Sequence, residues 1–189
     1  VPSMLRVSPN EAPSAAARAL LARAACLREW RPELGLPDLR EALAELLPEL
    51  CRGCLSFADL RRRDLSSALR GLLGGAGLAA LDQLAPERIE VPSGALLPLV
   101  YEPGRPPVLA VQLQHLFGLG EGPKVAGRVP VLLELLSPAG RPVQVTQDLR
   151  SFWNETYPRI RGGLRARYPR HSWPEDPWSA PPTGRPRRV

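Results

Sequence analysis

Residues 129–146 read VPVLLELLSPAGRPVQVT, and this stretch decides the fold. Two runs rich in Val and Leu, 129–136 and 142–146, flank the turn Ser137-Pro138-Ala139-Gly140. Aliphatic and β-branched runs on both sides of a Ser, Pro and Gly turn are typical of an antiparallel β-hairpin. The sequence therefore predicts two paired strands in the C-terminal half of the chain.

Upstream of this stretch, the pattern predicts another hairpin and then a helix. Residues 89–91 and 95–101 are strand-like runs on both sides of Ser93-Gly94, and Pro98 must lie at an edge or a bulge because it has no N–H to donate. Pro106-Pro107 opens a predicted helix, whose apolar residues recur with helical spacing at Leu109, Leu113, Leu116 and Phe117. Residues 118–127 are predicted to form a glycine-rich loop.

Downstream, one more helix is predicted from Thr146 and Asp148, which supply cap and first-turn groups. Pro158 should kink or restart this helix, because it cannot donate a backbone hydrogen bond. Tyr168-Pro169 should end it, since the residue before a proline disfavours helical angles.

The N-terminal half has the pattern of an all-helical segment. Ser14 can cap a helix that runs to Trp30, and Asp38 with Glu41 forms a capping-box-like start of a second helix. A third helix is predicted over 56–73, ended by Gly74-Gly75, and a fourth over 78–84.

These elements together predict an α+β fold. We expect an N-terminal helical segment at 14–85, then a small mixed domain at 87–178 with two β-hairpins and packed helices. Residues 1–13 are interpreted as a lead-in or truncated linker, and residues 179–189 as a flexible basic C-terminal tail.

Composition and missing motifs exclude several classes of protein. No apolar run approaches the roughly 18 residues of a membrane span and no secretory signal opens the chain, so the prediction is a cytoplasmic protein without a membrane partner. Cys51-x-x-Cys54 lacks the second ligand pair of a structural zinc site, so no metal is predicted. Neither glycine cluster, 71–77 or 118–124, has the Lys and Ser/Thr of a phosphate-binding ATPase loop. The chain alone is therefore predicted to hold no cofactor and to be no enzyme.

The positive charge is concentrated near the C-terminus. Residues 1–140 hold 14 Arg and one Lys against 15 acidic residues, whereas residues 141–189 hold 10 Arg against four, so the second part carries 10 − 4 = +6. A segregated basic segment is the electrostatic pattern of a protein that binds a phosphate backbone. The alternative is a solvated basic helix followed by a tail.

Arginines alternate with aromatic rings in this basic segment, a combination that pairs phosphates and stacks unpaired bases. The candidate nucleic-acid-binding residues are Arg159, Arg161, Arg165, Arg167, Tyr168 and Arg170. His171 beside Glu175 and Asp176 resembles an acid–base pair, but no nucleophile accompanies it. No catalytic residue is therefore predicted.

Several uncommon motifs occur in order along the second half. They are Pro106–Gly118, Gly127–Pro130, Leu135–Leu149, Phe152-Trp153 and the run RYPRHSWPEDP at 167–177. In these motifs the chain resembles the C-terminal region of HrpB-type ATP-dependent RNA helicases, bacterial members of the DEAH-box group, most closely over residues 87–178.

The resemblance implies an accessory region of an RNA helicase whose ATP- and Mg²⁺-binding domains lie upstream. Because every ATPase motif is missing, the chain is either a fragment or a stand-alone descendant, and no catalytic residue of the family transfers to it. The expected function is non-specific binding of RNA, with single-stranded DNA as a second nucleic acid, in support of the motor. The alternative is a docking module that braces the upstream helicase domains or recruits a protein, with the leucine-rich helices 38–50 and 65–84 exposing an apolar face. For the Trp-Pro-Glu-Asp-Pro segment no chemical role follows, and its rings and prolines are interpreted as folding it back onto the hairpins.

Overall fold

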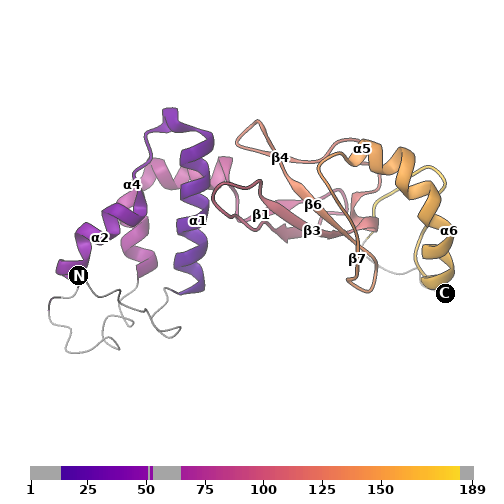
Figure 1. Ribbon diagram of the computed structural model, residues 1–189, viewed down its shortest axis with the longest axis horizontal. Helices are drawn as coiled ribbons and strands as arrows, with labels where there is room; N and C mark the ends of the chain where they lie inside the picture. The colour runs from indigo at the N-terminus through magenta and orange to yellow at the C-terminus, as the bar shows by residue number, and fades with distance from the viewer. Residues whose placement is uncertain (1–13, 51, 53–64, 184–189) are drawn as a thin grey trace, which may run out of the picture. The chain divides into compact units, whose positions relative to one another are not determined.

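The computed structural model describes residues 14–50, 52 and 65–183. The chain divides into two units, which Figure 1 shows as a helical part and a part with strands. Unit 1 holds the described residues up to Ala85, together with Glu102–Gly104. Unit 2 holds Pro86–Tyr101 and the described residues from Arg105 onward. The α+β class predicted from the sequence is confirmed.

Unit 1 is a small helical bundle. It consists of α1 (Ala15–Trp30), the 3-10 turn η2 (Pro32–Leu34), α2 (Leu39–Leu50) and α4 (Leu65–Leu84). Both predicted caps are present: Ser14 Oγ accepts from the Ala17 amide at 3.2 Å, and Asp38 Oδ1 accepts from the Arg40 and Glu41 amides. The three α-helices pack on one another and bury Leu20, Leu27, Leu39, Leu69, Leu73 and Leu81.

Two features fix the path of α4. Gly74 has φ 66° and ψ 175°, a conformation open to glycine alone, and it breaks the helix where the sequence predicts an end. At the other end, the buried side chain of Arg23 reaches from α1, with Nε donating to Ala85 O at 2.8 Å and Nη2 pairing with Asp82 at 3.0 Å. This contact satisfies a carbonyl that the helix end would otherwise leave without a partner.

The expectation of an apolar face on the leucine-rich helices stays a prediction. Among the described side chains, the large hydrophobic residues with high exposure all lie in unit 2. Leu39, Leu69, Leu73 and Leu81 are buried because three short helices need much of their apolar surface for their own core. Other described leucines of α2 and α4, such as Leu43, Leu46 and Leu72, are half-buried. In the described part of the chain, no helix is both long and apolar enough to cross a membrane.

Unit 2 contains both predicted hairpins. The first consists of β1 (Arg88–Glu90) and β2 (Leu96–Pro98), and the second of β6 (Leu132–Leu136) and β7 (Pro142–Thr146). The central sheet has the order β3-β6-β7. The predicted strand 129–136 is divided, because β5 (Val129–Pro130) pairs with β4 (Lys124–Val125) instead of β7.

The helix predicted after Pro106-Pro107 is wrong. Residues 108–112 form strand β3, which pairs in parallel with β6, and only Leu113–Leu116 turn helically, as the 3-10 turn η3. Leu109 and Val111 are buried while Ala110 between them is exposed, which is the period of a strand. Parallel pairing with the distant strand β6 stabilises the extended conformation of this segment. The β-branched residues Val108 and Val111 also favour this conformation.

The last helix has Asp148, two residues after the predicted Thr146, as its N-cap, and it changes from α-helical to π-helical and back. Asp148 Oδ1 accepts from the Ser151 amide at 2.9 Å, so Asp148 is the cap of α5 (Leu149–Ser151), and Thr146 ends β7. A π-helical turn, η4 (Phe152–Thr156), leads directly into α6 (Tyr157–Arg167). Figure 1 shows these elements as one orange rod. The Tyr157 amide donates to Phe152 O and Pro158 has no N–H, so the helix restarts there as predicted.

The core of unit 2 is aromatic. Trp153, Tyr157, Phe152 and Phe117 are almost fully buried, and their ring centroids lie 5.0 to 6.5 Å apart. The indole Nε1 of Trp153 donates to Leu119 O at 3.0 Å, so its polar atom is satisfied. This cluster fixes α6 against the loop that follows η3.

Candidate nucleic-acid interface

The predicted arginines lie on α6 and in the turn after it. Arg159, Arg161, Arg165 and Arg167 belong to the helix, which ends at Tyr168 as predicted, and Arg170 follows. The helix is held from inside by Tyr157, which is fully buried and donates its hydroxyl to Pro174 O at 3.0 Å. Burial raises the pKa of Tyr157 to about 12, so its hydroxyl stays a donor at neutral pH.

The arginines surround the helix rather than forming one stripe. With about 100° per residue, Arg165 and Arg167 lie roughly 160° apart, whereas Arg161 and Arg165 share one flank. The half-buried Ile160 and Leu164 lie between these flanks and face the core. A single straight strand therefore cannot contact all five guanidinium groups.

One arginine is already paired. Arg161 Nη2 lies 2.8 Å from Glu175 Oε1, and the Arg161 side chain is only 22% exposed. This hydrogen bond and the charge of Arg161 lower the pKa of Glu175, with a smaller contribution from Arg165. Arg161 therefore has a structural partner that a phosphate would have to replace.

The other four arginines present open cations. Arg159, Arg165, Arg167 and Arg170 are exposed, and none has an ion-pair partner among the residues that the structure describes. Arg165 and Arg167 lie in the last turn of α6 and Arg170 follows it directly. These three arginines, which we call the α6-end cluster, lie within a stretch of six residues.

Tyr168 has a structural role as a brace, that is, a side chain that joins two segments, and its ring is not an open stacking surface. It is half-buried, its hydroxyl donates to Ser137 Oγ at 3.3 Å, and its carbonyl accepts from Trp173 Nε1 at 2.9 Å. Its ring lies 6.4 Å from that of Trp173 and 6.5 Å from that of His171. Tyr168 thus joins the end of α6 to the turn between β6 and β7.

This brace brings in a cation that the sequence analysis missed. Arg141 is exposed, and its backbone amide donates to the same Ser137 Oγ that Tyr168 contacts. Arg141 therefore lies on the turn that the Tyr168 hydroxyl contacts. The available signal was the position of Arg141 as the first residue of the basic segment, but contact across a hairpin turn is not visible in sequence spacing.

A hollow of about 550 Å³ opens next to Arg165. Prolines form much of its lining, and its polar side chains are those of Arg165, His171, Ser172, Asp176 and Ser179. The Asp176 carboxylate is occupied, since it accepts from the Trp178 amide at 2.9 Å and from the Ser179 hydroxyl at 2.5 Å, and these contacts lower its pKa. The acid–base pairing considered for His171 is not formed, because Glu175 and Asp176 both have other partners.

A second cation lies beside an aromatic ring at the start of the last helix. Arg150 is 65% exposed, its guanidinium lies 5.9 Å from the ring centre of Trp178, and Glu121 Oε1 is 3.9 Å away. The nearby hollow of about 340 Å³ contains Lys124 and Arg150 but also Glu121 and Asp148. The charges there balance, so this hollow has no excess of positive charge.

The remaining reactive side chains have structural partners. Ser93 Oγ and His115 Nδ1 lie 2.5 Å apart and join the first hairpin turn to η3, and burial lowers the pKa of His115. Burial raises the pKa of Cys26 to about 11, so its thiol stays protonated. The Cys51-x-x-Cys54 pair lies outside the described residues. Within the described ranges, no three His, Cys, Asp or Glu side chains gather as metal ligands would.

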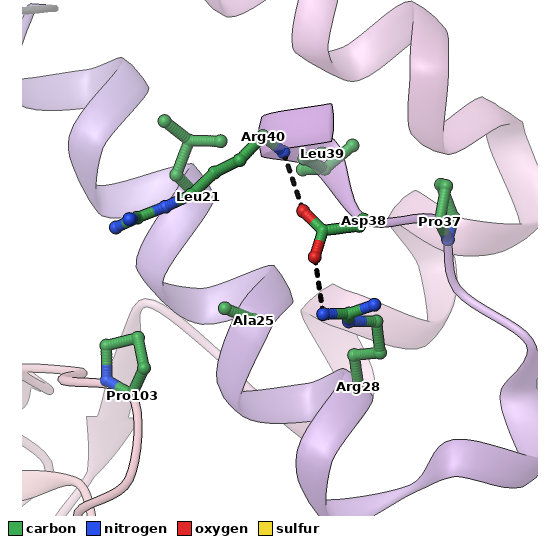
Figure 2. A pocket seen from close by; sticks show the side chains of 8 residues that line it. All are labelled: Leu21, Ala25, Arg28, Pro37, Asp38, Leu39, Arg40 and Pro103. Atoms are coloured by element: carbon green, nitrogen blue, oxygen red, sulfur yellow. Dashed lines mark hydrogen bonds and ion pairs between the residues drawn. The ribbon is translucent and has the colours of Figure 1, made fainter. Parts of the chain in front are cut away.

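The hollow in unit 1 has a role in folding. Figure 2 shows Asp38 between the amide of Arg40 and the guanidinium of Arg28, which lies 2.5 Å from its carboxylate. The Glu41 and Arg40 amides and the Arg28 charge lower the pKa of Asp38. The carboxylate is therefore used to start α2 and to tie it to α1, and the surrounding 240 Å³ offers no free reactive group.

Comparisons with known proteins agree on one relationship. Residues 46–177 match the family model HrpB_C, described as "ATP-dependent helicase C-terminal". The ATP-dependent RNA helicase HrpB of Escherichia coli (strain K12) is 41% identical over 179 residues, which are 91% of this chain and 22% of that protein. The crystal structure of the E. coli DExH-box NTPase HrpB superposes with a TM-score of 0.83 at 38% identity, covering 96% of this chain and 23% of that one. A second structure, the E. coli DEAH/RHA helicase HrpB, gives a TM-score of 0.68 at 37% identity over 85% of this chain and 21% of its own. The chain thus spans about a fifth of the length of these relatives.

Proposed function

This chain belongs to the HrpB family of ATP-dependent helicases, as their C-terminal region, and from that premise we propose that it binds the RNA backbone and holds the strand near the motor. The contact is non-specific in sequence, because guanidinium groups pair with phosphates that are the same at every nucleotide. In this proposal ATP and Mg²⁺ act in helicase domains upstream of the region, and the protein works in the cytoplasm.

One observation carries this proposal. Four of the five predicted arginines are exposed and without an ion-pair partner in the described part of the chain, although acidic residues are available elsewhere. An arginine can be favoured structurally in the last turn of a helix because its charge faces the negative end of the helix dipole, an effect that falls off beyond that turn. Arg170 and Arg141 lie outside α6, so that role does not account for them.

The test is the salt dependence of RNA binding by the intact helicase. Each phosphate contact to a single strand contributes about −0.7 to the slope of log K against log salt concentration. Replacing Arg165, Arg167 and Arg170 together with Gln should make this slope shallower by about 2 and weaken binding at low salt. A filter-binding titration with a single-stranded RNA of mixed sequence measures both, and a single-stranded DNA of the same length tests whether the 2′-hydroxyl matters.

The matched control removes the same charge elsewhere. Arg40, Arg70 and Arg128 are exposed, and their replacement with Gln should leave the slope almost unchanged. In the opposite direction, Glu175→Gln frees Arg161 and should steepen the slope by about 0.7. Equal slopes for the wild type and the α6-end variant would refute the proposal.

A further inference from the structure

The hollow of about 550 Å³ beside Arg165, which we call the α6-end hollow, has the composition of a ligand site. It is larger than the other two hollows, of about 340 and 240 Å³, and lies within the range of about 300–1,000 Å³ that small-molecule sites occupy. Prolines and Trp173 supply apolar walls, and His171 and Ser172 add polar groups. Apolar walls with a few polar groups are typical of sites that bind a small organic group.

The lining of the α6-end hollow is held by hydrogen bonds within unit 2. The Tyr157 hydroxyl donates to Pro174 O at 3.0 Å, which ties this part of the lining to α6. Further along the chain, the Ser179 hydroxyl donates to the Asp176 carboxylate at 2.5 Å and closes a turn. A ligand therefore meets a hollow that is already formed, and its binding orders little backbone.

Two side chains of the lining have no polar partner. His171 and Ser172 are half-buried. Within the described residues, neither the imidazole of His171 nor the hydroxyl of Ser172 makes a hydrogen bond. The His171 ring is held only by an edge-on contact with the Tyr168 ring, at 6.5 Å and 89°. By contrast, the imidazole of His115 lies 2.5 Å from Ser93 Oγ. A flat ring and a hydroxyl thus remain available to a ligand in the α6-end hollow.

The charges favour a neutral group inside the hollow and a phosphate outside it. Asp176 lines the hollow, and its carboxylate stays ionised because the contacts with the Ser179 hydroxyl and the Trp178 amide lower its pKa. A phosphate inside would meet this negative charge. Arg165 lines the same hollow but is exposed, so its guanidinium can pair with a phosphate in solvent.

We propose that the α6-end hollow takes one unstacked nucleobase of the RNA strand whose phosphates the α6-end cluster binds. This inference rests on the proposed function. His171 is the stacking surface, because histidine is one of the side chains on which splayed-out bases stack. The Ser172 hydroxyl can donate and accept, so it can pair with the edge of any base. The contact therefore selects single-stranded over double-stranded RNA without selecting a sequence.

The test is a thermodynamic cycle with the intact helicase, in which the protein and the RNA each lose one partner of the contact. Filter binding at one salt concentration compares the wild type with His171→Ala on a single-stranded RNA of mixed sequence and on an abasic RNA of the same length. On the RNA with bases, His171→Ala should bind about fivefold or more weakly, because stacking a base on an aromatic ring contributes this much. On the abasic RNA the two proteins should bind equally. The control His171→Phe keeps a flat ring and should recover most of the affinity.

A crosslink locates the base directly. The same RNA with 4-thiouridine in place of uridine is bound to the intact helicase, irradiated, and digested with trypsin. The photoreactive base should crosslink to the peptide that begins at His171, and the crosslink yield should fall in His171→Ala. Crosslinks that all lie outside this peptide would refute a base in the hollow.

The cycle separates the remaining occupants and roles. An equal loss of affinity on both RNAs would assign His171 a structural role or a contact with the sugar–phosphate chain, and an unchanged affinity on the RNA with bases would mean that a protein segment or nothing fills the hollow. Each of these results overturns the proposal. His171→Ala removes no phosphate contact, so it should keep the wild-type salt slope. A shallower slope of the α6-end variant without coupling in the cycle would refute this inference alone, whereas an unchanged slope of that variant refutes the proposed function.

Discussion

Replacing Tyr157 with Phe tests the contact that holds the segment after α6. Tyr157 is fully buried and its hydroxyl donates to Pro174 O at 3.0 Å, so the variant removes one oxygen and leaves this carbonyl without its donor. Leaving a buried acceptor without a hydrogen-bond donor lowers the free energy of unfolding by about 1–3 kcal/mol. Because Pro174 is half-buried and water can reach it in part, we expect a loss of about 1–1.5 kcal/mol in the free energy of unfolding.

The chain offers a control with the same chemical change. Tyr168→Phe also removes a hydroxyl, but that group is half-buried and lies 3.3 Å from Ser137 Oγ, so the loss should stay under about 0.5 kcal/mol. Urea unfolding followed by tryptophan fluorescence measures both variants. If Tyr157→Phe costs no more than Tyr168→Phe, the segment is not held by this hydrogen bond.

Tyr157→Phe should also change how the free energy of unfolding depends on pH above pH 10. Burial raises the pKa of Tyr157 to about 12 from 10.0, so the stability that the neutral phenol supports is complete below pH 10 and is lost as the pH rises toward 12. By pH 11 the wild type should have lost about 1.4 kcal/mol from this group. The Phe variant has no such group, so the difference between the two proteins should shrink to near zero at pH 11. Parallel pH profiles would refute the buried, protonated phenol.

Three further substitutions test single contacts, each by urea unfolding. Arg23→Met removes the buried donor to Ala85 O and should lower the free energy of unfolding by about 1–3 kcal/mol. The control Asp82→Asn should cost less, because Asp82 is 71% exposed. Equal costs would mean that the ion pair, and not the contact with the carbonyl, matters. Asp148→Ala removes the cap of α5 and should cost about 1 kcal/mol, with recovery in Asp148→Asn, which keeps the accepting oxygen. Gly74→Ala places a side chain at φ 66° and should cost about 1–3 kcal/mol, while Gly75→Ala, at an ordinary φ with open space around it, should be neutral or stabilising; the reverse order would contradict the break in α4.

Local chemistry predicted much of the fold. The caps at Ser14 and Asp38, the break at Gly74, the restart at Pro158 and both hairpins follow from short-range rules about hydrogen-bond donors, φ angles and turns. Such rules depend on a few neighbouring residues, so one sequence is enough to apply them.

The failure at residues 108–117 has a non-local cause. Leu109, Leu113 and Leu116 have helical spacing, but Leu109 and Val111 also alternate as in a strand, and the two patterns overlap over this length. Parallel pairing with β6, more than twenty residues away, selects the strand. Likewise, the charge split predicted a basic surface, but not that Glu175 pairs with Arg161 or that Tyr168 contacts the turn that carries Arg141.

The run at residues 173–177 gains a physical explanation from these contacts. Trp173 donates to Tyr168 O, Pro174 O accepts from Tyr157, and Pro177 O accepts from the Gly118 amide at 2.9 Å. With Glu175 on Arg161 and Asp176 closing its own turn, every residue of Trp-Pro-Glu-Asp-Pro has a partner within unit 2. The segment therefore acts as a clip that folds back onto α6 and the loop after η3, with no polar group left for chemistry. Because the clip fixes both ends of the turn that carries Arg170, the backbone of this turn is held in place within unit 2. If a polyanion binds there as proposed, it has to order less backbone than on a free basic tail, although the exposed arginine side chains still lose rotamer freedom.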